Sequence, residues 1–283
     1  MSPQDTVFSQ KIECIFNPDA APLVMGILNI TTDSFFDGGK YTSEIEWLAH
    51  TKKMIDEGAA IIDIGACSTR PGAEGISEAD EIEKLVKVVK SVRKQFPEII
   101  ISADTFRAAA AVNAVEAGAD IINDISGGTM DEKMFEVVSK LQVPYILMHM
   151  QGKPQTMQQN PQYENVTDEV FAFFTEKINE LKALGFSKVI IDPGFGFGKT
   201  TEHNYTLLKN FNKFKLLNFP LLAGVSRKSM INILLAVKSS EALNGTSILN
   251  TIALCNGAKI LRVHDVKEAV QAVKIWKYME ELN

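Results

Sequence analysis

The feature that most constrains the fold of this chain is a regular alternation of short apolar runs with longer amphipathic stretches. The runs are rich in Ile, Leu and Val, as in parallel strands that are buried on both faces. They lie at residues 23–30, 59–65, 99–105, 119–126, 144–150, 188–194, 220–226 and 259–265. Between them, the segments 78–96 and 165–185 have apolar residues at helical spacing, and Gly185 is expected to stop the second helix.

Strict alternation of eight strands with about eight helices favours a (β/α)8 TIM barrel over a doubly wound open sheet, the alternative for such a pattern. A barrel of about 250 residues accounts for most of the chain. No linker or low-complexity segment divides the sequence, so one domain is expected over residues 1–283. Residues 6–18 precede the first strand and are predicted to form a short N-terminal hairpin covering the bottom of the barrel.

Composition argues against several classes of function. With 29 basic and 35 acidic residues, the net charge is −6, and no nucleic acid partner is expected. No apolar stretch is long enough to cross a membrane, and the first residues lack the pattern of a secretory signal, so no membrane association is expected. The cysteines Cys14, Cys67 and Cys255 are scattered, which predicts a reducing, cytoplasmic location without disulfides.

Polar residues close the predicted strands, and in a (β/α)8 barrel the C-terminal strand ends meet on the face that holds the active site. They are Asn29, Asp63, Asp104, Asn123, Asp124, His149, Asp192, Ser226, Arg262 and His264. Any single Asp or Asn could instead cap the following helix. Capping does not account for Arg262 and His264 within a strand, so the set predicts a ligand site. The histidines have no metal-type spacing, and a zinc site is not expected.

Two loops and one helix start add candidate ligands for a phosphate group. In the first loop, Asn29, Asp33 and Asp37 are oxygen ligands suited to Mg²⁺, although a polar turn would have the same residues. In the second loop, Arg70 is suited to a bidentate phosphate contact, or is simply a surface arginine. Ser226 is expected to cap a helix opened by Arg227, Lys228 and Ser229, where free N–H groups attract an anion.

Eight motifs, in order along the chain, resemble the dihydropteroate synthase family. They are MGILNITTDSFFDGG, DIGACSTRPGAE, SADT, INDISGG, LMHMQG, DPGFGFGK, GVSRKS and LRVHDV, which span about residues 22 to 270. The motif SADT alone is weak evidence for this family, whereas the motifs STRPGA, DPGFGFGK and RVHDV, found together in this order, are highly specific to it. The resemblance implies a transferase of folate synthesis. It would join p-aminobenzoate to 6-hydroxymethyl-7,8-dihydropterin diphosphate, with Mg²⁺, and would be a sulfonamide target.

The resemblance also implies roles for individual residues, which form three groups. The pterin pocket would comprise Asp104, Asn123, Met148, Asp192 and Lys228. The diphosphate would meet Asn29, Arg70, Arg262 and His264, with Mg²⁺ on Asn29 and Asp37. The p-aminobenzoate slot would be lined by Phe35, Thr69, Pro71, Phe197 and Ser229. The catalytic set would be Arg70, Asp104, Asp192, Lys228, Arg262 and His264. A homodimer through the C-terminal helices 243–257 and 267–281 is also implied.

The stretch VIIDPGFGFGKT, residues 189–200, looks like a phosphate-binding loop but does not fit one. Pro193 stands where the first glycine of such a loop is required. Lys199 is therefore expected on the surface. Gly194, Gly196 and Gly198 are expected to give clearance beneath the two flat substrates.

Two other functions remain open from the sequence. A pterin-binding methyltransferase-type domain would share the pterin residues but would not need STRPGA or the anion site. A catalytically silent barrel that binds a ligand or a partner would keep the fold alone, and the intact set of assigned residues argues against it.

Overall fold

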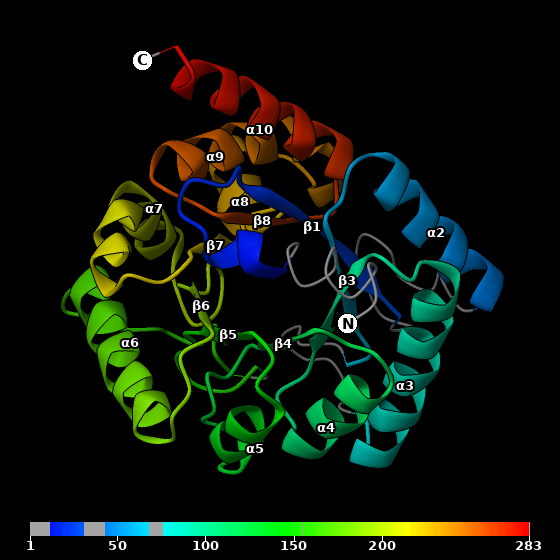
Figure 1. Ribbon diagram of the computed structural model, residues 1–283. Coiled ribbons are helices and arrows are strands. Elements are labelled where there is room, and N and C mark those ends of the chain that lie inside the picture. The colour runs from blue at the N-terminus through cyan, green and yellow to red at the C-terminus, as the bar shows by residue number, and fades with distance from the viewer. Residues whose placement is uncertain (1–11, 31–42, 68–75, 155, 283) are drawn as a thin grey trace.

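The computed structural model describes residues 12–30, 43–67, 76–154 and 156–282, and it contains a barrel of eight parallel strands (Figure 1). The strands are β1 (Leu23–Asn29), β2 (Ile61–Gly65), β3 (Ile100–Asp104), β4 (Ile121–Asp124), β5 (Tyr145–Met148), β6 (Val189–Asp192), β7 (Leu222–Ala223) and β8 (Ile260–Val263). Their order is β6-β5-β4-β3-β2-β1-β8-β7. A single bridge between Ile191 and Leu221 brings β6 beside β7 and closes the ring. The predicted (β/α)8 barrel is confirmed, and the open sheet was wrong.

Helices surround the barrel and bury one face each against the strands (Figure 1). They are α2 (Glu44–Asp56), α3 (Glu78–Gln95), α4 (Ala108–Glu116), α5 (Met134–Leu141), α6 (Val166–Ala183), α7 (Thr201–Lys209), α8 (Ser229–Leu235), α9 (Leu243–Cys255) and α10 (Val266–Glu280). Two of the predicted helices, 78–96 and 165–185, match α3 and α6 closely. Gly185 follows α6 with a φ of 74°, as a glycine that stops a helix does. Within the described ranges, no helix is long and apolar enough to cross a membrane.

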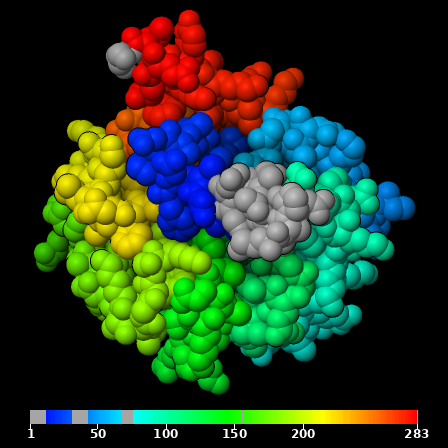
Figure 2. Space-filling view, in the orientation of Figure 1, coloured from blue at the N-terminus to red at the C-terminus, as the bar shows by residue number. Residues whose placement is uncertain are grey.

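The segment before β1 differs from the prediction. The described part of the predicted hairpin is residues 12–18. Of these, residues 12–16 form a turn of helix. Ile15 on this turn is 1% exposed and packs against residues at the N-terminal ends of the strands. Figure 2 shows the segment, in dark blue, at the centre of the face that it covers. The bottom of the barrel is therefore covered as expected, but by helical residues.

The barrel interior has two kinds of layer, because every second residue of a strand points inward. The lower layer, near the N-terminal strand ends, is entirely apolar: Met25, Ile61, Ile100, Ile121, Ile146, Ile190, Leu222 and Ile260. We call the next inward positions, toward the C-terminal ends, the upper layer. It contains Ile27, Asp63, Ser102, Asn123, Met148, Asp192, Gly224 and Arg262, with Asn29, Asp104 and His264 at the rim above. The fold thus collects polar groups at one end of the barrel only.

Candidate active site

The centre of the upper layer is Arg262, which joins two carboxylates from neighbouring strands. Its Nε donates to Asp63 Oδ2 at 2.7 Å, and its Nη2 donates to Asp104 Oδ2 at 2.9 Å. Asn123 Nδ2 donates to the same oxygen of Asp63 at 3.0 Å. The strands β2, β3, β4 and β8 thus contribute to one polar network. Arg262 was expected to contact a diphosphate, and the structure shows its guanidinium already paired with two carboxylates.

Burial has a strong effect on the acidity of this network. The pKa of Asp104 is raised to about 7, first by its removal from water and then by the charge of Asp63, while Arg262 opposes the rise. Asp63 has an exposed fraction of zero, and its Oδ1 has no hydrogen-bond partner among the described residues. Ser102 Oγ is also buried without a partner in that part of the chain. Unpartnered buried oxygens cost about 1–3 kcal/mol each, so this layer is built to meet a ligand or water.

A second acidic group, Asp192, faces Lys228 across Gly224. Asp192 lies at the end of β6, 5% exposed, and its Oδ1 accepts the amide of Gly194 at 2.8 Å. A β-carbon added to Gly224 would lie 3.8 Å from both Asp192 Oδ2 and Lys228 Nζ. Glycine therefore keeps open a space that these two charges share. Burial raises the pKa of Asp192, and Lys228 is the first of the groups that oppose the rise.

Lys228 is held over the loop that follows β6. Its Nζ donates to the carbonyl of Phe195, and it lies 4.8 Å from the centroid of the Phe197 ring. Burial lowers its pKa to about 8, against the attraction of Asp192. Near neutral pH the ammonium form therefore predominates, and it can donate to a ligand carbonyl as well as to the protein.

Of the other residues predicted for the pterin pocket, Asn123 is 3% exposed and Met148 is 2% exposed. They lie on the neighbouring strands β4 and β5 at the level of Asp192, whose Cα is the register partner of Met148. The structure thus places Asn123, Met148 and Asp192 in the upper layer, with Asp104 at the rim above it and Lys228 reaching in from the residue before α8.

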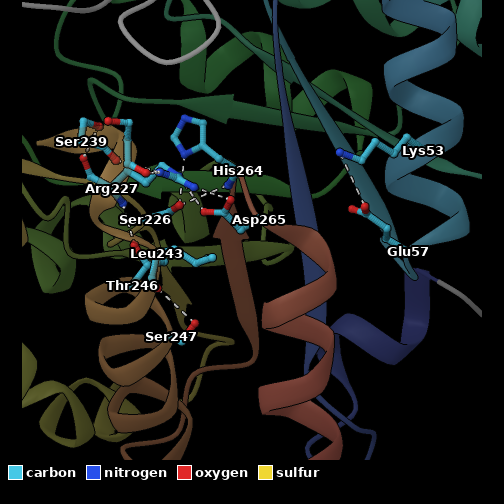
Figure 3. A network of polar contacts seen from close by, with 11 residues as sticks. Lys53, Glu57, Ser226, Arg227, Ser239, Leu243, Thr246, Ser247, His264 and Asp265 are labelled. Atoms are coloured by element: carbon cyan, nitrogen blue, oxygen red, sulfur yellow. Dashed lines mark hydrogen bonds and ion pairs between the residues drawn. The ribbon is translucent and has the colours of Figure 1, made fainter.

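The predicted cap at Ser226 was wrong. Helix α8 begins at Ser229, and Lys228 occupies the position before it without a side-chain capping bond. The Ser226 hydroxyl instead lies 3.1 Å from His264 Nδ1 and accepts the His264 amide at 3.2 Å (Figure 3). Ser226 therefore joins the ends of β7 and β8 and orients His264. Ser229 is exposed at the start of α8.

Lys199 was expected on the surface, and this was wrong. It is 3% exposed, and its Nζ contacts His149 Nδ1 at 2.9 Å and the carbonyls of Gly194 and Phe197 at 3.0 Å each. Burial lowers the pKa of Lys199 well below its usual value, and burial lowers that of His149 to about 2. Neutral His149 accepts from the lysine. This lysine holds the loop that carries Phe197 against the end of β5.

The glycines of the same loop have a different purpose from the one predicted. All three have positive φ, between 62° and 83°. A β-carbon on Gly194 would lie 1.9 Å from the carbonyl oxygen of His149, and one on Gly198 would lie 2.3 Å from that of Gln151. These two glycines therefore allow close packing against the protein's own backbone. A β-carbon on Gly196 would instead lie 3.3 Å from Cδ of the flexible Lys228 side chain, so Gly196 alone of the three remains compatible with the prediction that the glycines leave space for a ligand.

Asn29 lies at the rim, where its amide approaches Asp104. A β-carbon on Gly65 would lie 3.4 Å from Asn29 Oδ1 and 3.5 Å from Asp104 Oδ2, so both oxygens converge above this glycine. The remaining predicted site residues lie outside the described ranges: Asp33, Phe35, Asp37, Thr69, Arg70 and Pro71.

Two residues of the site were missed by the sequence reasoning. Asp63 was recognised as a strand end but given no role, although it accepts from both Arg262 and Asn123. Asp63 lies two residues after the inward-facing Ile61 on the same strand, so its side chain must also point into the barrel, and this spacing would have revealed its place in the site. Lys199 could not have been found in this way, because its burial depends on contacts with His149, which is distant in the sequence.

Comparison with known proteins gives a consistent answer. Residues 25–264 match the pterin binding enzyme family. The chain is 45% identical over 260 residues to a dihydropteroate synthase of Haemophilus influenzae, covering 91% of this chain and 94% of that protein. Its fold is similar to the Yersinia pestis dihydropteroate synthase solved with a sulfonamide drug, with a TM-score of 0.88, 41% identity, and coverage of 93% and 95%. The Xanthomonas albilineans enzyme in complex with 7,8-dihydropteroate has a TM-score of 0.82, 35% identity, and coverage of 93% and 95%.

Proposed function

Since the chain belongs to the dihydropteroate synthases of the pterin binding enzyme family, we propose that the upper layer of its barrel is the site of their reaction. The enzyme condenses p-aminobenzoate with 6-hydroxymethyl-7,8-dihydropterin diphosphate, giving 7,8-dihydropteroate and diphosphate in folate synthesis. The observation that carries the assignment of the site is the pair Asp192 and Lys228 facing one space across Gly224. A pterin edge offers a matching set of donors and an acceptor.

We propose that the pterin lies with its amino group and adjacent ring N–H toward Asp192. One oxygen of Asp192 is already engaged by the Gly194 amide, so the other is available to accept both donors. Lys228 would donate to the ring carbonyl. Asn123 would donate and accept at adjacent ring atoms, and Met148 would pack on the ring face. Asp104 and Asp192 would then favour positive charge on the pterin.

The reaction breaks a bond between the pterin methylene carbon and a diphosphate oxygen. Because the electron-rich ring stabilises positive charge at that carbon, cleavage can run ahead of attack by the amine. Arg262 and His264, with Arg70 outside the described ranges, would stabilise the departing diphosphate. The arylamine is neutral at pH 7 and needs no strong base before attack, so the main requirement is positioning. Crystals soaked with pterin diphosphate that show it far from Arg262 and His264 would contradict this assignment.

For the second substrate, we propose that p-aminobenzoate lies against Phe197 and toward Ser229. The Phe197 ring is half-buried beside Lys228, and Ser229 is exposed at the first residue of α8. Phe35, Thr69 and Pro71 complete the proposed slot from the two loops outside the described ranges. A sulfonamide that competes with p-aminobenzoate, raising its apparent KM without lowering kcat, would support this slot.

The proposed cofactor is Mg²⁺, held by Asn29 and Asp37. Asn29 Oδ1 is an oxygen ligand of the kind Mg²⁺ takes, and Asp104 Oδ2 is directed to the same place above Gly65. Within the described residues no group of three acidic, His or Cys side chains forms a metal site. Mg²⁺ that keeps its waters and takes substrate phosphate oxygens needs only one or two protein ligands, so the residues present fit it. When bound, it would neutralise charge on the diphosphate.

The deciding experiment combines purified protein with Mg²⁺, the pterin diphosphate and labelled p-aminobenzoate. Labelled pteroate is the expected product, and omission of the pterin diphosphate should abolish it. Substrate binding without product would favour a catalytically silent barrel. Methyl transfer from methyltetrahydrofolate to a corrinoid acceptor, without pteroate formation, would favour the methyltransferase-type alternative.

We also propose that the protein is a homodimer through its C-terminal helices. Large apolar side chains are exposed on α8, α9 and α10, which lie side by side (Figure 1): Ile233, Leu234, Leu235, Ile248, Ile252, Ile275, Tyr278 and Met279. Apolar surface of this extent is typical of a protein interface. By light scattering, Ile248→Glu should convert dimer to monomer. Ile45→Glu, a change at a residue that is 82% exposed on α2, should leave the dimer intact.

A cytoplasmic location is proposed as well. It is supported by the three cysteines, none of which forms a disulfide within the part of the chain that the structure describes, as suits a reducing compartment. Cell fractionation followed by the pteroate assay would test it.

A further inference from the structure

Between the two site residues Ser226 and Lys228 lies Arg227, whose backbone has an unfavourable conformation. Its φ is 54°, in the left-handed region that residues with a β-carbon rarely adopt. Glycine would adopt this conformation without strain, and the neighbouring loop after β6 uses glycine at each of its positive-φ turns. An arginine at such a turn indicates that its side chain is required there.

The side chain and backbone of Arg227 make contacts with three separate segments (Figure 3). Its Nε and Nη2 donate to the two carboxylate oxygens of Asp265, each at 2.7 Å, in a bidentate pair. Its Nη1 donates to the carbonyls of Ser239 and Ser240 at 2.7 and 2.9 Å. Its amide donates to Thr246 Oγ1 at 3.0 Å. The Arg227 side chain is 6% exposed, so solvent screens this pair little.

These contacts fix the turn to the framework around it. Asp265 follows His264 directly at the end of β8 and precedes α10. Thr246 is 1% exposed on α9, and Ser239 begins the short 3-10 helix η2 (Ser239–Glu241) between α8 and α9. The Ser239 hydroxyl returns a bond to the Arg227 carbonyl at 3.2 Å. Both peptide groups of Arg227 are therefore held, one by α9 and one by η2.

The residues on either side of Arg227 belong to the proposed substrate site. The Ser226 hydroxyl holds both the amide and the ring of His264. The Lys228 side chain reaches back over the loop after β6, to the carbonyl of Phe195. A change in the backbone dihedrals of Arg227 would move Ser226 and Lys228 relative to each other, because these two residues flank the turn.

We propose that Arg227 is a positioning residue for this reaction. Through Asp265, Thr246 and the η2 carbonyls it holds the left-handed turn that directs Lys228 toward the pterin and keeps Ser226 on His264, and it contacts neither substrate. This inference rests on the proposed function of the site.

The test compares Arg227→Lys with a matched change at a second arginine–aspartate pair. Arg93 on α3 pairs with Asp120 before β4 at 2.5 Å, at the opposite end of the barrel, with side chains 23% and 12% exposed. In both variants lysine keeps the charge and loses the guanidinium, which in Arg227 is bidentate to Asp265 and in Arg93 is shared between Asp120 and the Gly118 carbonyl. We expect Arg227→Lys to lower kcat/KM by about 30-fold, an effect within the range for one lost charge-assisted contact. Arg93→Lys should leave kcat/KM within about twofold.

Two further variants test the backbone contact and the side-chain contacts of Arg227 separately. Thr246→Val removes the acceptor for the Arg227 amide at nearly constant volume, with exposed Thr251→Val on the same helix as its control. We expect Thr246→Val to weaken pterin binding several-fold and Thr251→Val to have no such effect. Arg227→Gly relieves the backbone strain but leaves Asp265 and the η2 carbonyls without the guanidinium, so we expect it to lose activity even though glycine adopts the left-handed conformation easily.

The outcomes are distinguishable. If Arg227→Lys and Arg227→Gly keep wild-type kcat/KM for both substrates, the inference is overturned, whatever their melting temperatures. If the wild type itself forms no pteroate, the proposed function fails and the inference fails with it. If the Arg227 variants lose activity while their melting temperatures stay within the range of Arg93→Lys, positioning is supported over a general loss of structure.

Discussion

The lower and upper layers of the barrel interior are made by the same strands and differ by one inward step. On β6, the lower layer has Ile190 and the upper layer has Asp192; on β8 the corresponding residues are Ile260 and Arg262. The lower layer is apolar throughout and packs against Ile15, which covers the bottom of the barrel. The upper layer contains charged pairs and oxygens without partners among the described residues. The comparison teaches that a single strand serves both purposes: its lower inward residue contributes to stability and its upper inward residue contributes to the site.

The largest expected effect is on activity, at Asp192. Asp192→Asn keeps the shape but replaces an acceptor of two pterin N–H donors with an amide, and it removes the charge that favours a positive pterin. Two charge-assisted hydrogen bonds are worth about 4 kcal/mol together, so kcat/KM should fall by about 1,000-fold. Steady-state kinetics measure the fall, and the melting temperature should remain equal to or above that of the wild type. A tenfold or smaller loss would contradict the division of layers.

One inward step below, Ile190→Ala should have the opposite profile. The change leaves a cavity in the apolar lower layer, and the free energy of unfolding should fall by about 3 kcal/mol. Because the site lies above this layer, kcat/KM of the folded fraction should remain within about twofold of the wild-type value. Urea denaturation and kinetics at low temperature measure both quantities. A loss of activity as large as that of Asp192→Asn would show that the layers are not independent.

Lys199 tests whether a buried lysine beside the upper layer serves structure. In Lys199→Met, the carbonyls of Gly194 and Phe197 lose their donor, at a cost of about 1–3 kcal/mol each, while replacing a buried polar group by an apolar one offsets part of it. We expect a net destabilisation of about 2 kcal/mol and a raised KM for p-aminobenzoate. The control is Lys209→Met, a change at an exposed lysine of α7. Equal melting temperatures for the two variants would be the contrary result.

The smallest effect is a pH dependence of stability at Asp104. Its folded pKa of about 7 lies above the unfolded value of about 3.9, so the native state binds the proton more tightly. Its contribution to stability is full below about pH 4 and is lost as pH rises through 7. Relative to the wild type, Asp104→Asn should gain about 1.4 kcal/mol in the free energy of unfolding between pH 6 and pH 8. Denaturation at the two pH values measures this, and a constant difference would refute the raised pKa.

Much of the fold could be predicted because its signals are local. A strand buried on both faces shows as an apolar run, and eight such runs leave few architectures. Asp104, Asn123 and Asp192 could be predicted as members of a ligand site because they end strands whose ends must converge. Their role toward a pterin, and the inclusion of Met148 and Lys228, came from the resemblance of the motifs to a known family. The buried Lys199, the two glycines packed on backbone carbonyls and the missing cap at Ser226 could not, since each depends on contacts between segments that are distant in the sequence. The polar role of Asp63 was accessible from its alternation with Ile61.

The seam between β6 and β7 has a consequence for the exchange of amide hydrogens with solvent. There β7 is only two residues long, and one bridge joins Ile191 to Leu221. Asp192 and Lys228 lie on opposite sides of this seam, so a pterin bound to both would tie together the most weakly joined strands. We therefore expect the Ile191 amide, which donates to the Pro220 carbonyl at 2.9 Å, to exchange faster than those of β2 and β3, and to slow most when substrate binds.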